Sequence, residues 1–399
     1  MHNSPSTEQA DGGIPSQAAS VDDRRPLYVG SDVYRRAAFG SHHPLKIMRH
    51  SAVLDLVSIL GWLPEESFRD TEPATIDQLL TFHDRNYVDA LQYAESAGRV
   101  STEDRERFQI GTMENPVFEG LFERASMTVG GSIQAAKLAL EGHTAFHPSG
   151  GTHHGRPDRA SGFCYFNDPV FAIRTLLDSG LSRVMYIDLD AHHGDGVEDA
   201  FKEDFRVLTL SIHEADRWPY SGRQGDESSI NLPVPRGIND SEFELLVEHV
   251  VEPKIESFAP EAIVICCGAD CLAGDPLSAM MLSNVVLWDT VDRILAFGRP
   301  TVVLGGGGYN PWTVARYWAG LWGRINGEDM RPELPDEARH LLATMECDLI
   351  DEEDILPEWL TTLVDNRNRG PVRDEIRSMV RQAESGRRLA RGGQSCDVA

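Results

Sequence analysis

Short, nearly continuous apolar runs alternate with amphipathic stretches along most of this chain, and this alternation constrains the fold more than any other feature. Five runs are predicted to be strands: 26–30, 184–190, 207–213, 262–270 and 300–308. Runs of that length suit strands that are buried on both faces. Segments 118–141 and 239–258 have helical spacing, and the second begins at a predicted cap, Asn239. Strands alternating with helices predict an α/β fold, a parallel sheet with helices on both faces.

Composition excludes several classes of protein. The 399 residues are 41% hydrophobic, which is enough for one large or two smaller globular domains. No apolar run approaches the ~18–20 residues that span a bilayer, so no membrane association is expected. The formal net charge of −26 argues against direct nucleic-acid binding. Residues 1–25 contain no secretory signal, so the six cysteines are predicted to be reduced thiols of a cytoplasmic protein.

The two ends of the chain differ in composition from the middle. Residues 1–25 are rich in Ser, Gly, Asp and Gln and are predicted to be disordered. Segment 332–359 has ten acidic residues and one arginine, whereas segment 371–399 has six arginines and four acidic residues. We expect these segments to form a solvated helical appendage, and a surface for docking a partner is the alternative.

Residues with metal-binding or proton-carrying side chains lie at the carboxyl ends of the predicted strands, just beyond them, or before the GFCYFND segment. In chain order they are His153, His154, Asp188, Asp190, His192, Asp195, Ser211, His213, Asp270 and Tyr309. The carboxyl ends of parallel strands share one edge of the sheet, where open α/β folds place their sites. A single polar residue at a strand end is usually structural. Five such places in one chain predict a functional site.

Three of these residues have the donor types of a catalytic metal site. Asp190 and His192 are two apart at an extended strand end, so both side chains can face the same side. Asp270 from another strand end completes a set of one imidazole and two carboxylates. Three protein ligands with an open position are typical of a catalytic divalent cation, although oxygen-rich ligation leaves its identity open. Asp188 and Ser211 are left to hold a monovalent cation or to hydrogen-bond the strand ends.

The tandem histidines and a glycine run indicate acid–base chemistry. His153 and His154 follow a Gly-Gly turn and face two otherwise unpaired aspartates, which predicts His–Asp dyads. One histidine would then be a general base and the other would stabilise charge. The glycines at 305–308 let the backbone approach the site closely, and the Tyr309 hydroxyl can donate to an oxyanion. A phosphate loop is the competing interpretation, but the Lys-Ser/Thr that would follow is missing.

Four segments of the chain contain most of these residues: GGTHHGRPDRASGFCYFND, YIDLDAHHGDGVEDAF, CGADCLAGDP and LGGGGYN. They resemble the signature segments of the histone deacetylase superfamily. GTMENPVFEG and the extension after LWGRI make the chain similar to the bacterial class I-like, acetoin-utilisation (AcuC-type) branch. The resemblance implies an arginase/deacetylase-like, three-layer α/β/α fold with a central, mostly parallel sheet. It also implies a catalytic domain at 26–327 and a helical, charged C-terminal extension at 328–399.

The resemblance further implies an amidohydrolase that removes the acetyl group from N-ε-acetyl-lysine in proteins. In this assignment, Asp190, His192 and Asp270 hold zinc, or iron(II) in the cell. His154, paired with Asp195, is the proton shuttle. In the same assignment, His153, paired with Asp188, stabilises charge, and Tyr309 polarises the acetyl carbonyl. The expected substrate is an acetylated metabolic protein.

The resemblance also assigns substrate-binding and cation-binding residues. Phe163, Trp218 and Leu277 match walls of the acyl-lysine tunnel, and the Gly151 carbonyl matches the acceptor of the scissile amide N–H. Glu114 stands at a rim position that is usually Asp, and Trp218 replaces the commoner Phe. The resemblance places Arg49 in an internal acetate channel. It also implies a structural potassium site, at Asp188, Asp190, His192, Ser211 and Ile212. A second monovalent site is implied at Phe201, Asp204 and Val207.

Three alternative functions are compatible with parts of the pattern. Acetylpolyamine hydrolysis uses the same chemistry on a small molecule. A binuclear manganese ureohydrolase would need a further Asp two residues from Asp270, but position 272 is Leu. A non-enzymatic acetyl-lysine binder would lack a metal ligand or the tyrosine, and this chain has them all.

Overall fold

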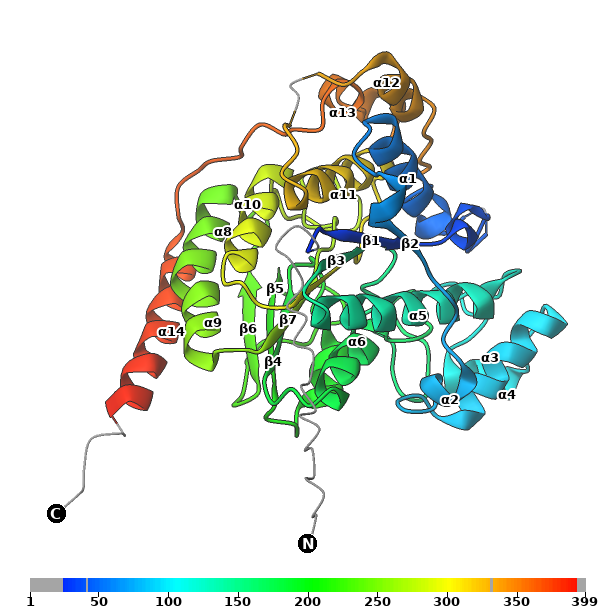
Figure 1. Cartoon of the computed structure of the whole chain (residues 1–399), viewed down its shortest axis with the longest axis horizontal. Coiled ribbons are helices and arrows are strands. Elements are labelled where there is room, and N and C mark those ends of the chain that lie inside the picture. Colours follow the sequence, from blue (N-terminus) through cyan, green and yellow to red (C-terminus); the bar gives the residue numbers. More distant parts are fainter. Residues whose placement is uncertain (1–23, 41, 331–332, 393–399) are drawn as a thin grey trace, which may run out of the picture.

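The computed structural model describes residues 24–40, 42–330 and 333–392, and its centre is one parallel sheet (Figure 1). Within these residues the sheet has eight strands in the order β2-β1-β3-β8-β7-β4-β5-β6, and every pairing is parallel. The strands are β1 (Leu27–Gly30), β2 (Phe68–Asp70), β3 (Thr144–His147), β4 (Val184–Asp188), β5 (Val207–Glu214), β6 (Ser229–Val234), β7 (Ala262–Cys266) and β8 (Thr301–Leu304). The predicted α/β fold with a central parallel sheet is confirmed.

The sequence pattern located β1, β4, β5, β7 and β8 but overlooked β2, β3 and β6. β2 has three residues and β3 has four, which is too short for a periodic signal. β6 is an edge strand that contains Pro233, and Pro weakens a strand signal. β4, β7 and β8 also end up to four residues earlier than predicted, because the polar and glycine residues that follow them turn away from the sheet.

Helices cover both faces of the sheet (Figure 1). Alternate residues of β4 show this: Met185 and Ile187 pack in one apolar cluster, whereas Val184 and Tyr186 pack in another, on the face of α5 and α6. The helices are α1 (His50–Ile59), α2 (Ile76–Leu79), α3 (Arg85–Ala97), α4 (Thr102–Phe108), α5 (Leu121–Leu140), α6 (Asp168–Asp178), α7 (Asp195–Phe201), α8 (Asp240–Leu246), α9 (Glu252–Phe258), α10 (Asn284–Leu295), α11 (Pro311–Ile325), α12 (Asp336–Ala343), α13 (Pro357–Thr361) and α14 (Asp374–Gly392). None of the described helices is long and apolar enough to cross a membrane.

The two segments predicted to be helical correspond to α5 and to the run from α8 to α9. A π-helical turn, Val247–Val251, joins α8 to α9. The predicted cap is present: the Asn239 side chain accepts N–H groups of the first turn, and the Glu242 carboxylate accepts the backbone N–H of Asn239.

The C-terminal segment is helical, but it is not the solvated appendage that its charge predicts. Leu342, Trp359, Leu363 and Ile376 are almost fully buried and belong to the same apolar cluster as one face of the sheet. Figure 1 shows α12 and α13 beside α1 and α11, and α14 beside α8 and α9. The predicted domain boundary after residue 327 stays a prediction, and the predicted disorder of residues 1–25 falls almost wholly outside the described residues.

Candidate active site

The predicted catalytic and metal-binding residues gather at the carboxyl edge of the sheet. β3, β8, β7, β4 and β5 are consecutive in the sheet, and the residues that follow them therefore share one edge. The loop after β3 carries the two histidines, β8 is followed by Tyr309, and β7 is followed by Asp270. β4 ends at Asp188 and leads into Asp190 and His192. All of these side chains are buried.

Asp190, His192 and Asp270 form a compact group of possible metal ligands. Their ligand atoms all lie within 4.8 Å of one another. His192 Nδ1 is 2.9 Å from Asp270 Oδ2 and 3.3 Å from Asp190 Oδ1. Burial, together with the charge on Asp190, raises the pKa of Asp270, so two buried carboxylates at this place are unfavourable without a cation. The donor set and its burial therefore fit a divalent cation.

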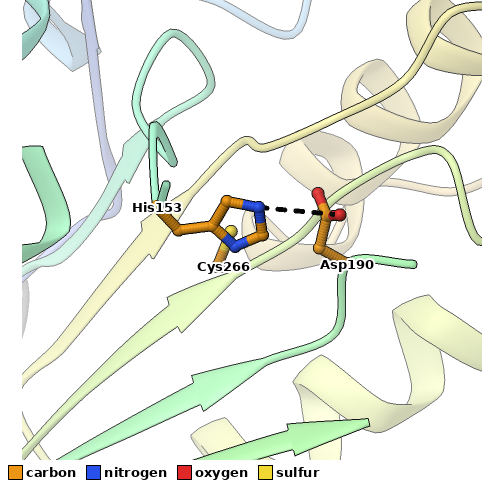
Figure 2. A group of neighbouring side chains, drawn as sticks. All are labelled: His153, Asp190 and Cys266. Carbon is orange, nitrogen blue, oxygen red and sulfur yellow. Dashed lines mark ion pairs between the residues drawn. The ribbon is translucent and has the colours of Figure 1, made fainter. Parts of the chain in front are cut away.

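Figure 2 shows a second group of possible ligands, in which the His153 ring faces Asp190 with Cys266 beside the ring. His153 Nε2 lies 3.8 Å from Asp190 Oδ1. Burial and the charge on Asp188 raise the pKa of the Cys266 thiol well above its usual value, whereas metal binding requires a thiolate. The group with Asp270 is therefore the better metal site. Cys266, Cys267 and Cys271 are free, buried thiols, as predicted.

Each histidine of the tandem pair bonds to its own aspartate. His153 Nδ1 lies 2.7 Å from Asp188 Oδ2, and His154 Nδ1 lies 2.7 Å from Asp195 Oδ1. A carboxylate at Nδ1 fixes the ring orientation and directs Nε2 of a neutral imidazole to act as an acceptor. This arrangement prepares each ring for proton transfer or charge stabilisation at Nε2.

The two histidines differ in charge because their surroundings differ. Burial disfavours the charged form of both rings, but Asp188 and Asp190 raise the pKa of His153 to about 9. Burial and the positive charge on His153 lower the pKa of His154 to about 4. These surroundings favour the charged form of His153 and the neutral form of His154. Only His154 is then in the protonation state of a general base.

Tyr309 is held beside the possible metal ligands by the glycine-rich turn after β8. Its ring centroid lies 6.5 Å from that of His192 and 5.8 Å from that of Phe163. A Cβ on Gly307 would lie only 2.1 Å from Asp270 Oδ2, so this close approach requires glycine. The Gly307 N–H donates to Asp190 Oδ2 at 2.6 Å, which joins the turn to the possible metal ligands.

One cavity of about 830 Å³ joins these groups to the surface loops. His154, His192 and Tyr309 all reach it, together with Phe163 and Trp218. The Trp218 ring lies 4.6 Å from that of His154, almost perpendicular to it at 78°. Leu277, Glu114, Gly162 and the buried Glu214 also line it. The exposed or half-buried residues at its outer part are Ala215, Asp216, Arg217, Tyr220, Pro235 and Arg236. The cavity thus leads between aromatic side chains to the polar groups at the sheet edge.

Comparison with known proteins agrees with this geometry. A model of the histone deacetylase domain matches residues 43–325. The chain belongs to the histone deacetylase family. Histone deacetylase RPD3 of Saccharomyces cerevisiae is 35% identical over 338 residues, 80% of this chain and 76% of that protein. Acetoin utilization protein AcuC of Bacillus subtilis is 32% identical over 332 residues, 79% of this chain and 85% of that protein.

Two solved structures have the same fold as this deacetylase over 90% of its length. The crystal structure of an HDAC homolog from Aquifex aeolicus has a TM-score of 0.86 and 35% identity, covering 90% of this chain and all of that chain. An HDAC homolog complexed with SAHA has the same TM-score and coverage at 34% identity. The predicted family, its AcuC-like members and the hydrolase class are therefore confirmed. The family is metal-dependent, in agreement with the Asp–His–Asp group.

The other predicted substrate-binding residues of the deacetylase also lie near the cavity. A Cβ on Gly151 would lie 2.6 Å from the Gly305 carbonyl oxygen, which places the Gly151 backbone against the glycine-rich turn. The Glu114 carboxylate accepts the backbone N–H of Gly162, next to Phe163, which lines the cavity. Glu114 therefore holds this part of the cavity wall, and its contact with a substrate stays a prediction.

Arg49 of the deacetylase is a partly buried residue behind the glycine-rich turn. Its Nη1 donates to the carbonyl oxygens of Gly306 and Gly308 at 3.0 and 3.1 Å, and its guanidinium lies 5.3 Å from the Trp318 ring centroid. Arg49 also lines two smaller cavities, of about 40 and 70 Å³, behind the catalytic residues. The place fits the predicted internal channel, whose function stays a prediction.

The residues predicted to bind potassium lie at the end of β4 (Asp188), just after it (Asp190 and His192) and in β5 (Ser211 and Ile212). Ser211 stands opposite Asp188 in the register of these strands, with Ile212 next to it. The Ser211 hydroxyl lies 2.9 Å from His213 Nδ1. At the second predicted site, Phe201, Asp204 and Val207 form a turn in which the Asp204 N–H donates to the Phe201 carbonyl. Whether these places hold monovalent cations stays a prediction.

Several supporting residues of the deacetylase were not predicted. Asp168 accepts the N–H groups of Gly151 and Thr152 at 3.0 and 2.7 Å, and it thereby fixes the loop before His153. Arg156 contacts the Asp195 carboxylate, and Tyr186 donates to Asp188 Oδ2 at 2.7 Å. All lie within the signature segments, but no sequence pattern indicates their partners.

Proposed function

We propose that this deacetylase removes the acetyl group from N-ε-acetyl-lysine in proteins, with zinc as the metal. One observation carries the proposal: His192 of the metal-ligand group, His154 and Tyr309 all reach a single cavity with the aromatic walls Phe163 and Trp218. An extended acyl-lysine side chain fits between such walls and brings its amide to the polar groups.

The side chains have complementary roles in amide hydrolysis. Asp190, His192 and Asp270 would hold the zinc ion, which supplies a Lewis acid for the acetyl carbonyl and acidifies a water molecule. His154 Nε2 takes a proton from the attacking water and later gives it to the leaving amine, while Asp195 stabilises the imidazolium. The Tyr309 hydroxyl donates to the oxyanion that develops on the substrate.

The cavity leaves room for the backbone on either side of an acetylated lysine, since its volume is about 830 Å³. Its charges do not distinguish a peptide from an acetylated polyamine, because Arg217 and Arg236 are accompanied there by Glu214 and Asp216. Acetylpolyamine hydrolysis is therefore the alternative to be tested.

The substrate class is tested by comparing an acetyl-lysine peptide with acetylputrescine on the zinc-loaded and the iron(II)-loaded protein. We expect a higher kcat/KM for the peptide with both metals. Both substrates meet the same catalytic groups, but only the peptide has a backbone that can contact the outer part of the cavity. A higher kcat/KM for acetylputrescine would contradict the proposed substrate class. A metabolic protein as the substrate, a cytoplasmic location and bound potassium are parts of the proposal that need separate tests.

Tyr309→Phe should lower kcat and leave substrate affinity almost unchanged. The substitution removes one oxyanion donor and keeps the ring, which costs on the order of 10²–10³ in kcat. KM should change much less, since the donor is needed most as charge develops. Tyr317→Phe is the matched control, because Tyr317 is buried in α11 and does not line the cavity. A kcat for Tyr309→Phe within about threefold of the parent, far short of that loss, would remove the hydroxyl from the mechanism.

A further inference from the structure

The C-terminal segment packs directly behind the turn that carries Tyr309. We propose that Trp359 of this segment is a positioning residue for Tyr309, so that the segment completes the catalytic site rather than merely covering the sheet. The inference rests on the role of Tyr309 in the proposed function. Trp359 is 6% exposed and does not line the catalytic cavity, so any effect on the reaction passes through other residues.

The backbone of Tyr309 is held at both of its polar atoms. Its N–H donates to Asp275 Oδ2 at 2.7 Å. Its carbonyl oxygen lies 3.6 Å from the Sγ of Cys347, which comes from the stretch after α12. Asp275 also accepts the N–H of Leu277, a wall residue of the cavity, at 2.9 Å. The position of Asp275 therefore determines the positions of the catalytic tyrosine and of part of the tunnel.

Trp359 holds the turn that carries Asp275. A Cβ on Gly274 would lie 2.7 Å from Cζ2 and 2.9 Å from Cη2 of Trp359, so the far edge of the indole covers this turn. The Gly274 carbonyl also accepts the Asn310 side-chain N–H at 3.0 Å. Trp359 and Asn310, the residue that follows Tyr309, thus both contact this turn. Without the indole, the turn would lose its contact with the C-terminal segment.

The same indole supports the helix that begins after Tyr309. Trp359 stacks on Trp312 of α11, with ring centroids 6.2 Å apart and an interplanar angle of 17°. Trp312 Nε1 in turn donates to the Leu342 carbonyl of α12 at 2.9 Å. Two elements of the C-terminal segment therefore fix the first turn of α11, and Tyr309 lies just before that turn.

Such support matters because catalysis depends on the exact position of the hydroxyl. A displacement of a reacting group by ~1 Å costs up to about 10²-fold in rate. We therefore expect Trp359→Ala to lower kcat roughly 10- to 100-fold, with KM within about twofold because the cavity walls other than Leu277 are not touched. Trp359→Phe keeps a ring on Trp312 but withdraws the atoms that cover Gly274, and it should lower kcat by a smaller factor.

The decisive measurement is a double-mutant cycle with Tyr309→Phe. If Trp359 acts through the tyrosine hydroxyl, Trp359→Ala and Trp359→Phe should have less than about a twofold effect on kcat once that hydroxyl is absent. Ile376→Ala in α14 is the matched control: Ile376 is fully buried in the same apolar cluster, so its loss should lower the melting temperature and leave kcat unchanged.

Two results would overturn the inference. One is an unchanged kcat in a folded Trp359 variant, and the other is an equal loss with and without the Tyr309 hydroxyl. If Trp359→Ala does not fold, the cycle with Trp359→Phe decides by the same criterion. Failure of the proposed function is a different outcome, because Tyr309→Phe alone would then have near-parental kcat.

Discussion

Asp270→Ala is expected to abolish stoichiometric binding of the catalytic metal together with deacetylation. Asp270 supplies one of two carboxylates in a group whose ligand atoms lie within 4.8 Å, and the other two ligands come from the stretch after β4. A Lewis acid contributes several kcal/mol to transition-state stabilisation, so its loss should lower kcat by about 10³-fold or more. Metal analysis of the purified variant and steady-state kinetics measure the two effects separately.

The control for this prediction is another aspartate that is fully buried. Asp240 accepts hydrogen bonds from Ser283 and the Asn368 backbone, away from the metal-ligand group. Asp240→Ala should lower stability but keep one metal ion per chain. Full activity of Asp270→Ala without bound metal would show that the reaction does not depend on this ion.

His154→Ala is expected to lower kcat by roughly 10²–10⁴-fold, the usual contribution of a positioned general acid–base group. The physical reason is its charge state: the low pKa leaves His154 neutral and able to accept a proton, while Asp195 orients the ring. His153→Ala should lower kcat less, because a cationic His153 stabilises charge but does not accept the proton.

Single-turnover rates of both variants, with the metal content checked, separate these roles. Added imidazole should restore part of the rate of His154→Ala, since it replaces the missing proton acceptor, and should do less for His153→Ala. Equal and slight losses in the two variants would place the general base elsewhere in the cavity.

Most of the fold could be predicted from the sequence because its central strands are continuous apolar runs. The signal fails where an element is very short or lies at an edge, as in β2, β3 and β6. It fails differently in the C-terminal segment. There the many charges of 332–359 conceal a few widely spaced buried residues, such as Leu342 and Trp359, and composition alone predicts exposure.

In the candidate site as well, the residues of local motifs were predicted, whereas the tertiary contacts that hold them were not. The resemblance assigned roles to the side chains of the signature segments, and the structure places His154, His192 and Tyr309 in one cavity. The groups that hold them were not predicted. Asp275 bonds to the backbone N–H of Tyr309, and such a bond depends on how two loops meet in space. No pattern in a single sequence indicates which two loops will pack against each other.

The support of Tyr309 by Trp359 also has a consequence for the order of events during translation. The ribosome makes the catalytic tyrosine 50 residues before the tryptophan that braces it. At about 5–20 residues per second, the interval is roughly 3–10 s. During that interval the nascent chain already contains the proposed metal ligands Asp190, His192 and Asp270. We expect it to gain full hydrolytic activity only after Trp359 has been made and has packed against the Gly274 turn.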